Sequence, residues 1–113
     1  AMASNRGLNK VMVIGWLEDD PEVRQTPSGR AVASFSVATS RAWTSSEGDR
    51  HEEKEWFNVV AWGTLAEMCK DQVLKGQQIY IEGRLQTRSW EDSLGRKHFR
   101  TEVVAQELIV LSD

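Results

Sequence analysis

Residues 78–90 read QIYIEGRLQTRSW, and this stretch decides the fold because its side chains alternate in character. Side chains of a β-strand point to opposite faces in turn, so parity assigns each to a face. One face takes Ile79, Ile81 and Leu85, whereas the other is polar and carries Tyr80, Glu82, Arg84, Gln86, Arg88 and Trp90. The pattern predicts a strand whose Trp90 lies on the arginine-bearing face. Gly83 interrupts the apolar face and predicts a bulge or bend.

A second alternating stretch runs from about Glu55 to Trp62. Phe57, Val59 and Ala61 form its expected core face, and the opposite face carries Trp56, Asn58, Val60 and Trp62. At a rise of about 3.3 Å per residue, the indoles of Trp56 and Trp62 lie ~20 Å apart. We expect Trp56, Trp62 and Trp90 to be surface rings, the alternative being a sheet face covered by a subunit or a helix.

Three more strands and one helix surround these two stretches. The strands are expected at Leu8–Leu17, Ala31–Ser40 and about His98–Leu111, with turns at Thr26–Gly29 and Glu91–Lys97 and a long polar loop at Thr44–Lys54. A capping box from Thr64 to Glu67 predicts a helix start, and Gly76 a helix stop. Five strands with one short helix between the third and the fourth predict an all-β fold, the five-stranded OB-fold Greek-key barrel.

The first strand contains the run Val11-Met12-Val13-Ile14, which is apolar on both parities. Such a run predicts burial on both faces. In a small domain the second cover could come from another subunit. Trp16 follows on the same strand, where packing in the core or a subunit interface is the favoured interpretation. Trp43 comes just after the expected end of the Ala31–Ser40 strand, so parity predicts no orientation for it.

Length and composition indicate the domain organisation and exclude several classes of protein. The 113 residues predict one domain, 1–113, with a flexible segment at about residues 1–6. The single cysteine, Cys69, excludes a disulfide framework and is expected to pack in the helix. Neither a membrane span nor a secretory signal is visible, which predicts a soluble intracellular domain. His51-Glu52-Glu53 and Asp19-Asp20 are weak metal candidates; no metal, no cofactor and no catalytic residue is expected, and the protein is not expected to be an enzyme.

Charge is sorted along the chain. The chain has 14 Lys and Arg against 17 Asp and Glu, yet the bases largely coincide with the strands. A basic surface on an acidic protein is therefore possible, although ordinary solvated charges would give the same count. Exposed indoles interleaved with Arg suit single-stranded nucleic acid, because bases stack on the rings and cations pair with phosphates.

The chain resembles the bacterial-type single-stranded DNA-binding proteins, a family of homotetrameric OB-folds that also occurs in mitochondria. The resemblance rests on motifs from end to end, among them Leu8-Asn9-Lys10-Val11, Asp20-Pro21-Glu22-Val23-Arg24, Tyr80-Ile81-Glu82-Gly83-Arg84-Leu85, Thr87-Arg88-Ser89-Trp90 and Thr101-Glu102-Val103-Val104. It implies sequence-independent binding and protection of single-stranded DNA in replication, recombination and repair. It also implies a homotetramer, located in the bacterial cytoplasm with the nucleoid rather than in a mitochondrial matrix.

The resemblance also implies site residues. The base-stacking positions are Trp43, Trp56, Trp62 and Trp90, of which Trp43 is carried by the resemblance alone. The phosphate-binding positions match or neighbour Arg6, Lys10, Arg24, Lys75, Arg84 and Arg88. Trp62 stands where the family often has Phe, and Trp16 where it commonly has Asn.

Two further expectations concern partners. Family members usually continue into a Gly/Pro/Gln-rich linker and an acidic tip that docks replication and repair proteins, whereas this sequence ends at Asp113 after the last expected strand. We expect a shortened chain or a tailless variant, so such partners are expected only if the full-length protein has a tail. The alternative function is a replication-restart or other protein-interaction module on the same fold, which need not keep four stacking aromatics.

Overall fold

The computed structural model describes residues 6–112 of the chain. Residues 1–5 lie outside that range, and with them nearly all of the expected N-terminal flexible segment. Within residues 6–112 there are six strands and one helix, in the order β1 (Val11–Leu17), β2 (Glu22–Gln25), β3 (Ala31–Thr44), β4 (Arg50–Trp62), α1 (Thr64–Gln72), β5 (Gln78–Glu91) and β6 (Lys97–Val110).

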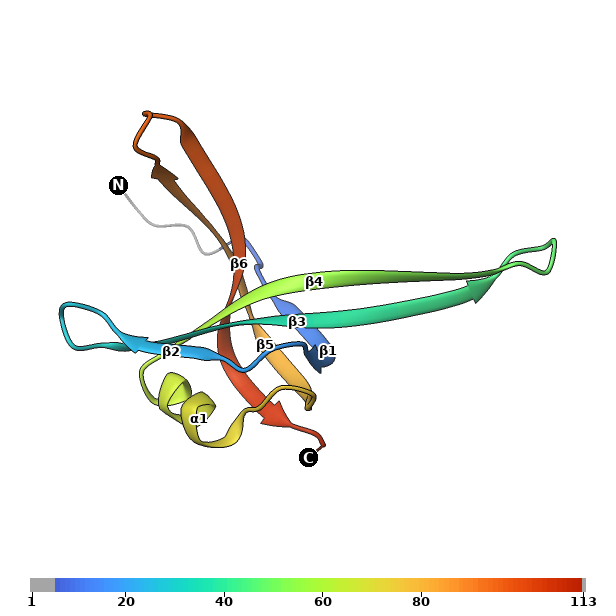
Figure 1. Cartoon of the computed structure of the whole chain (residues 1–113), viewed down its shortest axis with the longest axis horizontal. Helices are drawn as coiled ribbons and strands as arrows, with labels where there is room; N and C mark the ends of the chain where they lie inside the picture. Colours follow the sequence, from blue (N-terminus) through green and yellow to red (C-terminus); the bar gives the residue numbers. More distant parts are fainter. Residues whose placement is uncertain (1–5, 113) are drawn as a thin grey trace.

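The strands form one sheet that closes on itself. Their order is β1-β5-β6-β4-β3-β2, and an additional pairing of β1 with β3 joins the two ends of the five-strand part. The predicted five-stranded OB-fold barrel is therefore confirmed, with one short helix between β4 and β5 (Figure 1). β2 was not predicted; it is a four-residue strand that pairs with β3 at the open edge, too short to show an alternating pattern.

Two glycines lie where backbones approach most closely. A Cβ at Gly15 would lie 2.3 Å from the carbonyl oxygen of Ala38, at the seam where β1 meets β3. A Cβ at Gly83 would lie 2.1 Å from the carbonyl oxygen of Val104. The predicted bulge is present there, because the β5–β6 register shifts between Glu82 and Gly83. Only glycine allows these approaches without displacing backbone.

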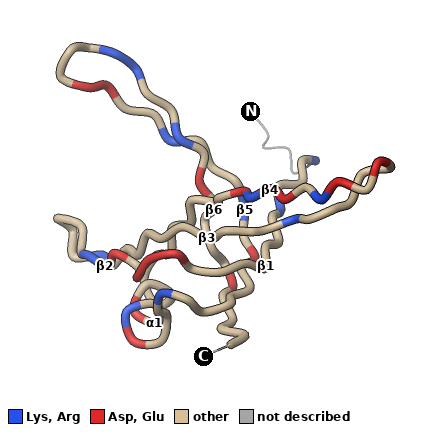
Figure 2. The backbone as a smooth tube through the Cα atoms, turned by 45° about the vertical axis from the view of Figure 1, so that its right-hand side comes forward, with Lys and Arg blue, Asp and Glu red and all other residues tan. Residues whose placement is uncertain are grey.

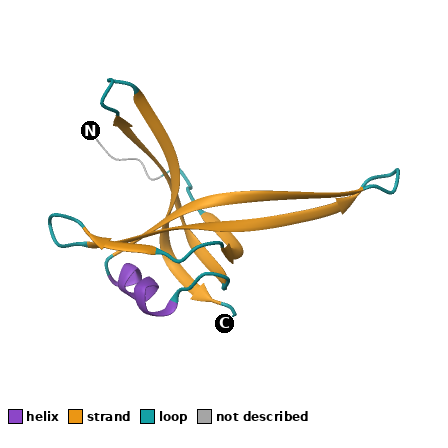
Figure 3. Ribbon diagram, in the orientation of Figure 1, coloured by secondary structure: helices purple, strands orange, loops and turns teal. Residues whose placement is uncertain are grey.

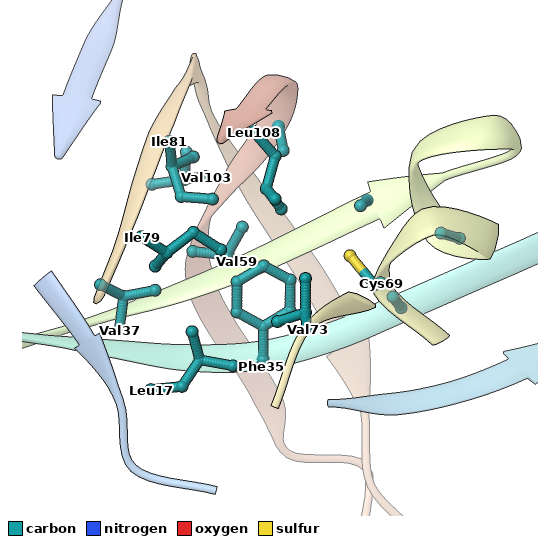
Figure 4. Packing of buried hydrophobic residues seen from close by; sticks show 14 of the residues in the cluster. Leu17, Phe35, Val37, Val59, Cys69, Val73, Ile79, Ile81, Val103 and Leu108 are labelled. Carbon is teal, nitrogen blue, oxygen red and sulfur yellow. The ribbon is translucent and has the colours of Figure 1, made fainter. Parts of the chain in front are cut away.

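The barrel interior is filled by side chains from five strands and the helix. Phe35 is surrounded by aliphatic residues of neighbouring strands, and Val73 and Cys69 close the helix side (Figure 4). The largest fully buried side chains are Leu17, Ile79, Ile81, Val37, Val59, Val73, Val103 and Cys69. The predicted core faces of β4 and β5 are thus confirmed for Val59, Ala61, Ile79 and Ile81, whereas Phe57 is only half-buried and Leu85 is exposed.

The helix begins where the sequence predicts, but by a different mechanism. Gly63, with φ of 61°, is its N-cap, and no side chain caps the first turn. The predicted capping box is wrong because Thr64 is already helical; the amide of Glu67 donates to the carbonyl of Gly63 instead. The helix also ends before Gly76, at Gln72, because Val73 turns extended to fill the core. Gly76 serves the following turn with φ of 89°.

Two long hairpins extend from the barrel and dominate its outline (Figures 1 and 3). The β3–β4 arm continues the pairing without a break to Thr44 and Arg50. The predicted loop at Thr44–Lys54 is therefore wrong: only residues 45–49 turn, and the expected strand boundaries at Ser40 and Glu55 fall inside strands. The β5–β6 arm turns at residues 92–96, as the sequence predicts.

β1 is buried on one face only, which corrects the expectation from its doubly apolar run. Its buried side chains are Val13 and Leu17, while Met12, Ile14 and Trp16 remain exposed in the single chain. The strand also begins at Val11 rather than Leu8, and Leu8 is 90% exposed.

Candidate nucleic-acid interface

A concave surface lies on the outside of the barrel, between the edge strand β2 and the base of the β5–β6 arm. Five strands contribute to it, because the outward residues of β2, β3, β4, β5 and β6 converge there. Its lining is Glu22, Arg24, Thr26, Val32, Ser34, Val60, Trp62, Gln86, Arg88, Arg100 and Glu102. Three arginines and one indole in a single hollow are what the phosphates and bases of a single strand require.

Trp62 is the aromatic residue of this concave surface. It is half-buried at the end of β4, directly opposite Val32. The Arg30 guanidinium carbon lies 4.5 Å from its ring centroid, a cation–π distance. Arg30 follows the turn at Thr26–Gly29, where the amide of Gly29 donates to Thr26. The turn therefore places a cation over one face of the indole.

Trp56 lies further along the same face of β4 and is 56% exposed. Alternation carries this face from Trp62 through Val60 and Asn58 to Trp56. Val60 is buried although it lies on the predicted outer face, because it sits on the floor of the concave surface against β6. Trp56 faces Ala38 of β3, and Ala38 in turn faces Trp16 of β1, so Trp16 and Trp56 flank one small residue.

Trp90 belongs to the β5–β6 arm and shares a face with Arg88, as parity predicts. The Arg88 guanidinium carbon lies 5.3 Å from the Trp90 ring centroid. Arg88 and Arg100 stand opposite each other in the register and both approach Glu102, at 3.7 and 3.8 Å. Because the Glu102 side chain is buried, it anchors both arginines between the concave surface and the arm.

Trp43 lies on the β3–β4 arm, on the face opposite to that of Trp56. It is inside β3, so parity does hold, and alternation from Phe35 places it on the continuation of the core face beyond the barrel. It is 40% exposed, and the Arg41 guanidinium carbon lies 4.7 Å from its ring centroid. Because β3 is longer than expected and includes Trp43, alternation along the strand gives the orientation that the sequence did not predict for this residue.

The expected phosphate-binding residues do not form one cluster. Arg24 and Arg88 line the concave surface. Arg84 is exposed and shares the Arg88 face of β5. The other three lie elsewhere: Arg6 precedes β1, Lys75 follows α1, and Lys10 forms an ion pair.

The ion pair of Lys10 belongs to a small polar group at the base of β1. The Lys10 Nζ lies 3.3 Å from Glu82, which also accepts a 2.7 Å hydrogen bond from the Tyr80 hydroxyl. That hydrogen bond, followed by Lys10, lowers the pKa of Glu82. The same hydrogen bond raises the pKa of Tyr80. Lys10 is therefore engaged with a carboxylate rather than free for a phosphate.

Sequence reasoning missed Arg30 and Arg100, which the fold brings to the concave surface and its indole. Alternation could have predicted Arg100. It shares a strand face with His98, and His98 is the register partner of Trp90. Nothing local pointed to Arg30. The two histidines were missed as well: His51 stacks on Trp43 and His98 stacks on Trp90.

The arms differ in charge (Figure 2). Between residues 84 and 100 the β5–β6 arm has five bases and two acids, whereas between residues 41 and 55 the β3–β4 arm has three bases and five acids. The sorted charge of the sequence is thus resolved in space: the arm continuous with the concave surface is basic, and the other is acidic.

Other chemistry is sparse in the described part of the chain. No group of three His, Cys, Asp or Glu side chains within residues 6–112 is placed to hold a metal ion. Cys69 is buried in the core, and burial raises the pKa of its thiol to about 11. No helix in these residues is long and apolar enough to cross a membrane.

Comparisons with known proteins agree with this geometry. The model of the single-strand binding protein family matches residues 8–111. A single-stranded DNA-binding protein 1 from Chlorobaculum tepidum is 51% identical over 107 residues, which are 94% of this chain and 66% of that protein. The chain thus spans slightly less than two thirds of the length of this curated relative.

Solved structures show the same fold. A Plasmodium falciparum SSB in complex with ssDNA superposes with a TM-score of 0.86 at 26% identity, covering 97% of this chain and 100% of that one. A deletion mutant of the single-stranded DNA binding protein from Thermus aquaticus has a TM-score of 0.82 and 38% identity, covering 96% of this chain and 53% of that one. The chain therefore has the barrel fold of these proteins, with indoles and arginines together on its outer surface. The chain belongs to the single-strand binding protein family, whose members are non-enzymatic DNA-binding proteins.

Proposed function

We propose that this protein binds single-stranded DNA without sequence preference and protects it during replication, recombination and repair. The observation that carries the proposal is the repeated pairing of an exposed or half-exposed indole with an arginine. Such pairs occur at Trp62, Trp43 and Trp90. A base stacks on a ring at a gain of ~1–3 kcal/mol, and a neighbouring guanidinium can reach the adjoining phosphate.

The proposed DNA path uses the concave surface and both arms. Bases stack on Trp62 in the hollow, on Trp56 along β4, and on Trp43 and Trp90 in the arms. Arg24, Arg84 and Arg88 contact phosphates beside Trp62 and Trp90, while Arg6, Lys10 and Lys75 are contacts outside the hollow. Lys10 would have to leave Glu82 to take part. Duplex DNA binds poorly, because its bases are stacked on one another and unavailable to the rings.

Titration of tryptophan fluorescence with oligothymidylate tests this function. Saturable quenching by the single strand is expected, with a matched duplex quenching far less at the same salt concentration. Quenching by neither DNA would contradict base stacking and favour the alternative, a protein-interaction module on the same fold. Duplex binding as tight as single-strand binding would contradict the proposal itself.

We further propose a homotetramer, in which the outer face of the β1–β5–β6 sheet contacts other copies of the chain. Ile14, Tyr80 and Ile109 lie side by side across three strands in the register. Met12, Ile14 and Ile109 are 64%, 53% and 44% exposed, an apolar patch that a second copy could cover. Light scattering is expected to give four times the 12.8 kDa chain mass, and Ile14→Glu to shift it toward smaller species. A monomer in the unaltered protein would contradict this assembly.

The proposed setting follows from the function. The protein works in the bacterial cytoplasm together with the nucleoid, where single strands arise. Replication and repair proteins are partners only of a longer protein that carries a C-terminal acidic tip. The chain needs no metal or cofactor for this role, because stacking and ion pairing suffice.

A further inference from the structure

Both histidines of the chain stand directly opposite a tryptophan. His51 is the register partner of Trp43 on the β3–β4 arm, and His98 is that of Trp90 on the β5–β6 arm. The Trp43 and His51 ring centroids lie 5.3 Å apart with an interplanar angle of 21°. The Trp90 and His98 centroids lie 5.6 Å apart at 17°. Each arm therefore presents two nearly parallel rings side by side.

An arginine completes each pair. Arg41 and Arg88 both stand two residues before the tryptophan, and each lies over its indole. The two hairpins thus build the same three-membered arrangement, which we call the Arg–Trp–His stacks: Arg41, Trp43 and His51 on one arm, and Arg88, Trp90 and His98 on the other. Its recurrence on two separate hairpins points to a common ligand rather than to barrel packing.

The imidazoles are accessible. Both histidines are exposed, and the His98 side chain retains 44% of its surface. None of the side-chain hydrogen bonds and ion pairs within residues 6–112 involves the His51 imidazole, whose ring stacks on Trp43. The His98 Nε2 lies 2.8 Å from Asp92 Oδ2, which leaves Nδ1 as its second polar atom.

The charges around the two imidazoles differ. On the His51 face lie Arg41 and Glu53, which pair at 3.7 Å, with Asp49 in the adjoining turn. Around His98 lie Asp92, which also binds Arg96, and the flanking arginines Arg88 and Arg100 with their shared Glu102. A protonated imidazole is compatible with both settings, since it can stack on the indole as a cation.

We propose that His51 and His98 contact single-stranded DNA, each widening an indole platform for one base and, when protonated, binding a backbone phosphate. This proposal rests on the proposed function, because the base must first stack on Trp43 or Trp90. The proposal adds a dependence on pH to the proposed function. Each protonated imidazole provides one further phosphate contact on its arm.

The test compares affinity for oligothymidylate at pH 7.5 and pH 5.5, because thymine does not titrate between these values. Each gained contact is expected to tighten binding roughly fivefold at 0.1 M salt and to steepen the slope of log K against log salt by ~0.7. The double variant His51→Phe, His98→Phe keeps a ring at each site and removes the proton, so its pH response should vanish. Each single variant should retain about half of the response on the logarithmic scale.

Lys70→Gln on α1 is the matched control, because it alters a surface charge remote from both arms and should preserve the pH response. Circular dichroism at both pH values shows that each variant is folded. A double variant with an unchanged pH response would overturn the proposal, and so would a native protein that binds equally at both pH values. Absence of binding by the native protein at pH 7.5 would instead defeat the proposed function.

Discussion

The β3–β4 arm and the β5–β6 arm are built alike and charged in opposite ways. Each is an antiparallel hairpin with an Arg–Trp–His stack. The β5–β6 arm is basic and begins at the concave surface, whereas the β3–β4 arm is acidic and turns its Trp43 away from the face of Trp56. The comparison teaches that the same ring stacking can occur twice on a fold while positive charge is concentrated on one side.

The arms also leave the barrel differently. The register of β3 with β4 is continuous from Val32 to Thr44, while β5 and β6 change register at Gly83. The bulge increases the local twist and redirects the β5–β6 arm.

Gly83→Ala should destabilise the protein by about 3 kcal/mol or more, because the new Cβ would collide with the backbone of Val104. Gly48→Ala, at the tip of the β3–β4 arm, is the comparison. Its new Cβ meets no neighbouring atom and costs only the strain of a positive φ, about 1–2 kcal/mol. Urea unfolding of both variants measures the difference. Equal losses would mean that the bulge does not constrain the β5–β6 arm.

Trp90→Leu should weaken binding of oligothymidylate by about 2 kcal/mol, and Trp43→Leu by about 1 kcal/mol. Trp90 lies on the basic arm beside Arg88, so a base held there gains a phosphate contact close by. Anisotropy of labelled DNA at a fixed salt concentration gives both affinities. The comparison of the arms would fail if Trp43→Leu had the larger effect.

The double change Arg88→Gln, Arg100→Gln should flatten the salt dependence by ~1.4 in the slope of log K against log salt, or ~0.7 for each lost contact. The double change Arg41→Gln, Arg50→Gln should flatten it by less than ~0.7, because neighbouring acids already neutralise that arm. Titrations at four or more salt concentrations measure the slopes. Equal slopes in the two variants would show that both arms bind phosphates alike.

The smallest effect concerns the turns at the tips of the arms. Asp92 accepts hydrogen bonds from the amides of Leu94 and Arg96 and from His98, and the bond from His98 is the main cause of its lowered pKa. The ionised Asp92 therefore stabilises the turn of the β5–β6 arm. This stabilisation is complete above the ordinary Asp pKa of ~3.9 and is lost as pH falls through the lower pKa of Asp92 in the folded protein.

Below about pH 4, hydrogen exchange at the Leu94 amide should therefore quicken relative to that at Gly48, because the amides of the Gly48 turn donate to the Ser45 hydroxyl and carbonyl rather than to a carboxylate. Amide exchange followed by NMR across this range provides the measurement. A constant ratio of the two rates would show that Asp92 does not hold the β5–β6 tip.

Prediction from the sequence succeeded where a strand is half-buried. Residues 78–90 alternate because one face of β5 fills the barrel and the other meets solvent, so Ile79, Ile81 and the face of Trp90 were all placed correctly. It failed at residues 44–54, because the distal β3–β4 arm is exposed on both faces. No apolar alternation marks such a hairpin, and its cross-strand pairs are invisible until the register is known.

The sequence by itself determined the barrel, the bulge at Gly83 and the presence of indoles beside arginines, because these depend on alternation, glycine geometry and short-range spacing. Only the tertiary structure decided that Arg30 lies over Trp62, that Arg24, Arg88 and Arg100 meet in one hollow, and that each histidine faces a tryptophan. These arrangements depend on strand register and barrel closure. Both arise from contacts between residues far apart in the chain, which no local pattern encodes.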